Sequence, residues 1–104
     1  MTQTLAQIME RTQWFRQARF GMFLHWGLYS IPARGEWVLS HDPGIVERYP
    51  RYLDCFNPEG YQPKEWARQA KAAGMQYMIL TAKHHDGFCL FDSQWTDYKA
   101  TNTP

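Results

Sequence analysis

The stretch QYMILTAKHHDGFCLFD, residues 76–92, decides the fold. It begins with the apolar run Tyr77–Leu80 and then becomes polar at KHHDG, residues 83–87. A continuous apolar run is typical of a parallel strand that is covered on both faces. Because ligands of α/β proteins gather at the carboxyl ends of such strands, the histidines after this run indicate an active-site edge.

A second segment, RFGMFLHWG at Arg19–Gly27, repeats this pattern, because its apolar residues are followed by His25. Between the two segments we predict a helix over Pro63–Ala73, since proline suits a first helical position and Gly74 suits the residue after the end. Strand, helix and strand form a βαβ unit with parallel strands. The sequence therefore predicts an α/β fold with the histidines of both strand ends at one edge.

The remaining segments are less regular. Thr4–Ala18 is predicted to be an amphipathic helix, capped by Thr2 or Thr4, with an apolar face. That face consists of Leu5, Ile8, Met9, Thr12 and Phe15. The predicted helix after the long loop has a narrow face of small residues with one large anchor, made of Trp66, Ala67, Ala70 and Ala73.

The connection Leu28–Tyr61 is rich in proline and glycine, and we expect only a short helix at Gly44–Tyr49, capped by Asp42. Loops of this length inside compact domains are usually functional. Residues 92–104 are polar and are predicted to have no element of their own. Two parallel strands cannot bury both faces of a sheet, so we expect residues 1–104 to be an incomplete domain. Either partner chains complete it, or it is the front piece of a longer protein.

Composition excludes several classes of function. The chain has 104 residues and a net charge of +1 with neutral histidines, which argues against a nucleic-acid-binding module. The N-terminus has no signal-peptide pattern, and no apolar run approaches the ~20 residues of a membrane span. We therefore expect a cytoplasmic protein with no membrane partner. Cys55 and Cys89 are expected to be isolated, buried, reduced thiols rather than a disulfide.

Metal and nucleophile chemistry fit the residues poorly. Potential ligands are present at His25, His84, His85, Asp86 and Asp92, but their spacing is not that of a zinc site. Adjacent histidines on an extended chain point to opposite sides. There is no G-x-S-x-G motif and no glycine-rich phosphate loop. We predict neither a metal nor a cofactor.

Sugar recognition fits the residues better. A neutral imidazole donates one hydrogen bond and accepts another, which suits His25, His84 and His85 for binding hydroxyl groups. In the long loop, Glu36 and Trp37 add two acceptors, one donor and an aromatic face. The alternative for this pair is a surface glutamate beside a tryptophan buried under the loop. For Lys83 and Asp86 we favour an ion pair that supports the turn.

Three stretches carry a resemblance to a known family. RFGMFLHWGLYSIP (19–32), GEW (35–37) and FNPEGYQPKEWARQAKAAGMQYMILTAKHHDGF (56–88) resemble the amino-terminal part of family 29 glycoside hydrolases, the α-L-fucosidases. The resemblance extends from about Trp14 to Pro104. It implies a (β/α)8 TIM-like barrel for the whole protein, of which this chain holds the first two parallel strands, helices and a long first βα loop. It also implies retaining hydrolysis of terminal α-L-fucose from glycoconjugates or oligosaccharides.

The resemblance assigns substrate binding, not proton transfer, to five positions. His25 matches a histidine that binds fucose hydroxyls, Glu36 and Trp37 match a pair that grips the sugar, and His84 and His85 match paired histidines that line the pocket. A retaining glycosidase also needs two carboxyl groups about 5–5.5 Å apart. The resemblance implies that the nucleophilic aspartate and the acid/base glutamate lie beyond Pro104. Residues 1–104 alone are therefore expected to be inactive.

Two other functions stay open on the sequence. In the first, the chain is a non-catalytic carbohydrate-binding piece; in the second, it is a structural fragment without a ligand. In the fucosidase interpretation the partner is a fucosylated glycan, and an oligomer or the remainder of the barrel covers the sheet. No nucleic-acid partner is expected.

Overall fold

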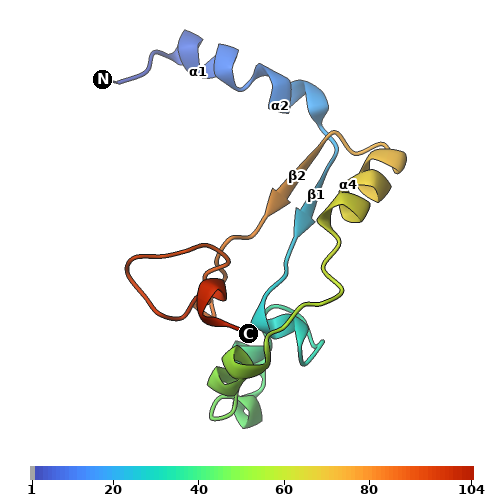
Figure 1. The fold of residues 1–104 in the computed structure, drawn as a ribbon. Helices are drawn as coiled ribbons and strands as arrows, with labels where there is room; N and C mark the ends of the chain where they lie inside the picture. The colour runs from blue at the N-terminus through green and yellow to red at the C-terminus, as the bar shows by residue number, and fades with distance from the viewer. Residues whose placement is uncertain (1) are drawn as a thin grey trace. The chain divides into compact units, whose positions relative to one another are not determined.

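Two parallel strands form the sheet of this chain. A computed structural model describes residues 2–104, with β1 at Gly21–Leu24 and β2 at Tyr77–Leu80. The strands are neighbours and run in the same direction (Figure 1). Gln76 N donates to Phe20 O at 2.8 Å before the strands, and Thr81 N donates to Leu24 O at 2.9 Å after them. The predicted α/β fold with two parallel strands is confirmed.

The connecting helix α4 spans Pro63–Ala72, close to its predicted bounds. Its end has a physical reason: Gly74 adopts φ +87°, which glycine tolerates without strain. Gly74 N and Met75 N then donate to Lys71 O and Ala70 O, each at 3.0 Å, which closes the last turn. The predicted small-residue face is only partly right. Ala70 is buried and Trp66 half-buried, whereas Ala67 and Ala73 are exposed.

The N-terminal helix is broken in two. Helix α1 spans Leu5–Arg11 and helix α2 spans Gln13–Ala18, whereas a single helix was predicted. Thr4 caps α1, since its Oγ1 accepts from Gln7 N while Gln7 Oε1 accepts from Thr4 N. Thr12 ends α1 because its backbone leaves helical geometry at ψ 4° and its hydroxyl donates to Ile8 O at 2.8 Å.

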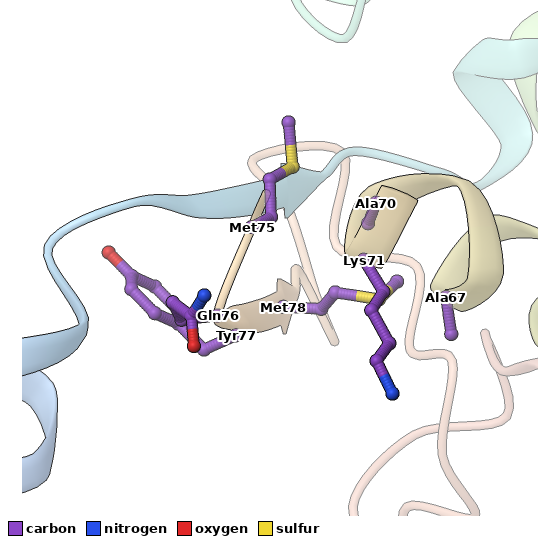
Figure 2. A pocket seen from close by; sticks show the side chains of 7 residues that line it. All are labelled: Ala67, Ala70, Lys71, Met75, Gln76, Tyr77 and Met78. Carbon is purple, nitrogen blue, oxygen red and sulfur yellow. The ribbon is translucent and has the colours of Figure 1, made fainter. Parts of the chain in front are cut away.

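The chain divides into two compact units. Unit 1 consists of residues 2–23 and Gln62–Ile79, and unit 2 of Leu24–Tyr61 and Leu80–Pro104. In unit 1, the Tyr77 ring contacts Phe15 and Trp14 at centroid distances of 5.1 and 6.2 Å. This cluster covers Gly21, where any side chain would overlap the Tyr77 ring. Tyr77 and the next residue of β2, Met78, both line a hollow of about 520 Å³ beside α4, although their side chains extend in different directions (Figure 2).

Unit 2 contains nearly all of the buried core, and the long loop builds it. The loop folds into short helical turns: η1 at Leu28–Ser30, α3 at Val38–His41, η2 at Pro43–Ile45 and η3 at Tyr49–Cys55. The one helix predicted in this loop, at Gly44–Tyr49, is replaced by the shorter turn η2 after Asp42. As expected, Asp42 caps it, because Oδ1 accepts from Gly44 N at 3.0 Å. The core cluster consists of Leu28, Tyr29, Val38, Ile45, Tyr49, Phe56 and Phe88.

The C-terminal segment is more structured than predicted. The backbone of Cys89 forms isolated β-bridges, antiparallel with Lys83 and parallel with Lys99. The 3-10 turn η4 follows at Ala100–Asn102. Lys99 Nζ forms an ion pair with Asp92 Oδ1 at 2.8 Å. No local sequence pattern predicted this pair. Both thiols are free as expected, but only Cys89 is buried, and the prediction of burial for Cys55 is wrong. Within residues 2–104, no helix has the length and apolar character to cross a membrane.

Candidate functional site

The site is built where the chain leaves the two strands. In unit 2, the hydrogen bond from Thr81 N to Leu24 O holds the two outgoing segments side by side. His25 follows β1 directly, and His84 lies in the turn after β2. Their imidazole rings meet edge to face, with centroids 5.3 Å apart. The expected meeting of the two strand-end histidines is therefore present in the structure.

The long loop adds Trp37 to this histidine pair. Val38, the first residue of α3, is buried in the core and fixes the residue before it. The Trp37 ring stacks on His85 with centroids 4.3 Å apart and meets His84 edge to face at 5.2 Å. Trp37 is nevertheless 41% exposed, so it is not the tryptophan buried under the loop that was the alternative. An indole and three imidazoles thus share one site.

Glu36 is half-buried and immediately precedes Trp37 in the loop. Tyr29 is buried, and its ring meets the His84 ring edge to face with centroids 5.6 Å apart. Burial, and then the negative charges of Asp86 and Glu36, raise the pKa of Tyr29 to about 12. All five residues predicted for the site, His25, Glu36, Trp37, His84 and His85, lie in unit 2, and the rings of the four ring-bearing residues contact one another.

The turn that carries His84 and His85 is closed by local hydrogen bonds. Gly87 N donates to His84 O at 3.1 Å, and Gly87 has φ +82°, a conformation that favours glycine. Asp86 Oδ1 accepts from Phe88 N at 3.2 Å, and Asp86 Oδ2 accepts from Tyr49 Oη at 2.8 Å. The predicted ion pair of Lys83 with Asp86 is wrong: among residues 2–104, the ion-paired carboxylates are Asp42, Glu65 and Asp92.

Burial and the Asp86 charge keep the surrounding phenols protonated. The pKa of Tyr49 is raised well above its usual value, first by burial and then by the hydrogen bond to Asp86. Burial, followed by the Asp86 charge, also raises the pKa of Tyr98 to about 12. Tyr49 therefore remains a neutral hydroxyl that can donate to the carboxylate at any physiological pH.

One buried nitrogen of the site lacks a partner. His84 Nδ1 is buried and makes no hydrogen bond within residues 2–104. Leaving such a group unsatisfied costs about 1–3 kcal/mol, so buried polar atoms without partners need an explanation. A ligand hydroxyl is one group that would satisfy this nitrogen. In the same range, no set of three or more histidine, cysteine, aspartate or glutamate side chains is arranged to hold a metal ion.

Sequence reasoning missed several members of the site. Tyr29 lies in the HWGLYS stretch but carries no signal that separates it from ordinary core residues. His41 stacks on Trp37 with centroids 6.2 Å apart, and its place one helical turn after Trp37 was a usable signal. Tyr49 is 37 residues from Asp86, so no local pattern pointed to their hydrogen bond.

Fold and site together define an α/β protein with a cluster of histidines, an indole and a carboxylate at the ends of two parallel strands. A family model described as "Alpha-L-fucosidase" matches residues 1–104. The chain belongs to the α-L-fucosidase family, as its sequence resemblance implied.

Individual relatives agree with this family. Tissue alpha-L-fucosidase of Rattus norvegicus is 44% identical over 92 residues, which are 73% of this chain and 20% of the rat protein. Alpha-L-fucosidase isoenzyme 1 of Paenibacillus thiaminolyticus has a TM-score of 0.84 and 66% identity, over 91% of this chain and 23% of that structure. The chain thus spans about a fifth of the length of the curated relatives it matches.

A second solved structure comes from Bacteroides thetaiotaomicron. It is a GH29 alpha-L-fucosidase described as a trapped covalent intermediate in complex with 2-fluoro-fucosyl fluoride. It matches with a TM-score of 0.79 and 38% identity, over 99% of this chain and 25% of that chain. The agreement in backbone therefore extends over nearly every residue of the present chain.

Proposed function

We propose that the whole protein is a retaining α-L-fucosidase that removes terminal α-L-fucose from glycoconjugates or oligosaccharides. Its catalytic domain would be a (β/α)8 TIM-like barrel that begins with the βαβ unit of this chain. Membership of the family supports this proposal, as does the likeness to the Bacteroides structure with its fucosyl ligand. The substrate would be a fucosylated glycan.

One observation carries the assignment of the sugar site. The rings of His25, Trp37, His84 and His85 each lie within 5.3 Å, centroid to centroid, of another ring of this group. Imidazole nitrogens pair with sugar hydroxyls, and the exposed Trp37 offers an apolar face to the ring carbons. Glu36 adds carboxylate acceptors beside them. We assign binding and orientation of fucose to these residues.

The carboxyl groups that perform the chemistry are assigned to other parts of the protein. Retaining hydrolysis needs a nucleophile and an acid/base about 5–5.5 Å apart. Asp86 is unsuited to either role because both of its oxygens already accept hydrogen bonds, from Tyr49 and from Phe88 N. Only Glu36 remains among the carboxylates placed at the site. We therefore place the nucleophilic aspartate and the acid/base glutamate outside residues 1–104.

The test uses the protein expressed from the complete reading frame that encodes this chain. We expect it to hydrolyse an aryl α-L-fucoside but not an aryl β-D-galactoside, and to release α-L-fucose first in a proton NMR time course. His84→Ala with His85→Ala should raise KM because binding partners of the sugar are lost. Absence of hydrolysis, or β-fucose as the first product, would contradict the proposal.

A second candidate function is carbohydrate binding without cleavage. For residues 1–104 taken alone it is favoured because both oxygens of Asp86 already accept hydrogen bonds. For this piece we expect no release of the aryl group above the rate of the His84→Ala/His85→Ala variant. Turnover above that control would show that the piece holds its own catalytic groups. The cytoplasmic location stays a prediction from the sequence.

A further inference from the structure

The position of His84 does not come from hydrogen bonds of its own ring. Its Nδ1 has no partner within residues 2–104, and its neighbours are the edges and faces of other rings. Ring contacts of this kind have weak directional preference compared with hydrogen bonds. The backbone turn that carries the imidazole must therefore determine where it lies.

That turn is tied to the core at one point. Tyr49 is 2% exposed and belongs to the core cluster, so its ring cannot move without disturbing its neighbours. Its hydroxyl donates to Asp86 Oδ2 at 2.8 Å, across 37 residues of chain. The other oxygen, Asp86 Oδ1, accepts from Phe88 N and closes the turn from within. One carboxylate thus joins the histidine turn to a rigid part of the loop.

We propose that Asp86, held by the buried Tyr49, is a positioning residue. It keeps His84 and His85 in place beside Trp37, so that they can bind the ligand. The proposal rests on the sugar site described above, and it gives Asp86 a structural task within that site rather than a catalytic one. Without the Tyr49 hydroxyl, the turn keeps only its internal bonds, and the imidazoles lose their fixed distance from the indole.

Four substitutions separate this role from general destabilisation. Tyr49→Phe removes the hydroxyl and keeps the ring in the core, whereas Asp86→Ala removes both acceptors. Asp86→Asn is the conservative variant, because its oxygen can accept from Phe88 N while its amide donates to the Tyr49 hydroxyl. Tyr52→Phe is the matched control: Tyr52 lies on η3, contacts the Tyr49 ring at 5.4 Å and makes no hydrogen bond to Asp86.

The first measurement reports position and needs no enzyme activity. The protein from the complete reading frame is labelled with 5-fluorotryptophan, and the Trp37 signal is assigned with Trp37→Phe. Because Trp37 stacks on His85, displacement of the turn should change its fluorine resonance. We expect a shifted or broadened signal in Tyr49→Phe and Asp86→Ala, recovery in Asp86→Asn, and an unchanged signal in Tyr52→Phe. Unchanged signals in both Tyr49→Phe and Asp86→Ala would overturn the proposal.

The second measurement is the division between KM and kcat on an aryl α-L-fucoside. A hydrogen bond to a charged group is strong enough for Tyr49→Phe to raise KM about tenfold, with kcat within about threefold of the parent. A variant that merely unfolds would lower the apparent kcat and keep KM, and that result would also overturn the proposal. If the parent protein neither hydrolyses nor binds fucosides, the proposed function fails while the fluorine signals still decide the role of Asp86.

Discussion

The two units of this chain differ in how they use their apolar residues. In unit 2, Leu28 is completely buried, and the irregular loop around it provides most of the core. In unit 1, Ala70 is the buried apolar residue among those described, while Leu5 is 72% exposed on a well-formed helix. The regular elements with the clearest sequence patterns are thus the least buried, and the segment with no periodic pattern is the most tightly packed.

This difference separates local structure from stability. Helix α1 forms because of its cap and its composition, and neither requires a partner surface. The backbone hydrogen bonds within the loop join residues only two to four positions apart, so packing of side chains such as Tyr49 and Leu28 must hold its turns together. The candidate site is attached to the packed unit, which fits a site that must hold its geometry.

The largest expected effect tests whether unit 2 is the stability centre. Leu28→Ala removes a fully buried side chain and should lower the free energy of unfolding by about 2–5 kcal/mol. Leu5→Ala, on the exposed face of α1, should change it by less than about 0.5 kcal/mol. Urea denaturation followed by circular dichroism measures both. Equal losses in the two variants would remove the contrast between the units.

Alkaline pH should act on unit 2 next. The pKa values of Tyr29 and Tyr98 are raised to about 12, above the usual value of 10, and burial is the main cause. The unfolded chain therefore loses these protons first, and stability is full below about pH 10 and falls as pH rises toward about 12. Urea midpoints measured across this range should decline, and less steeply in Tyr98→Phe. A midpoint independent of pH would contradict the burial of these phenols.

A substitution at Gly21 tests the aromatic cluster of unit 1. A methyl group there would overlap the Tyr77 ring, which is held by Phe15 and Trp14. We expect Gly21→Ala to cost about 1–3 kcal/mol, and much less in a Tyr77→Ala background where the overlap is gone. Gly60→Ala is the control, because nothing lies within 4 Å of a side chain at that position. An equal cost at both glycines would show that the overlap does not matter.

The smallest expected effect is at the cap of α1. Thr4→Ala removes the hydroxyl that accepts from Gln7 N and should cost about 1 kcal/mol, visible as reduced helical circular dichroism at 222 nm. Thr2→Ala removes an exposed threonine that is not the cap and should leave the spectrum unchanged. If the two variants behave alike, the capping box contributes nothing to this helix.

Some parts of the site were predictable because their signals are local. His25 and His84 each follow an apolar run, and parallel strands bring their carboxyl ends together, so the meeting of these rings could be inferred. The bounds of β2 and α4 were predicted well for the same reason. The break at Thr12 was missed, because a threonine inside an amphipathic pattern does not show that its hydroxyl will bond back to Ile8.

Lys83 illustrates what sequence proximity cannot settle. It is close to Asp86 in the chain and of opposite charge, yet Asp86 accepts its side-chain hydrogen bond from Tyr49. A buried hydroxyl held by the core is a better partner than an exposed ammonium group, which gains little from an ion pair in water. The choice depended on where the loop folded, which residues 83–87 do not specify.

By itself, the sequence determined the parallel strand–helix–strand order, the cap at Asp42, the end of α4 at Gly74 and the histidines at the strand ends, because these follow from neighbours a few residues apart. Only the tertiary structure decided that an irregular loop forms the core, that Trp37 stacks on His85, and that Tyr49 holds Asp86. These contacts join residues far apart in the chain, and their free energy comes from burial and packing that exist only after the loop has folded.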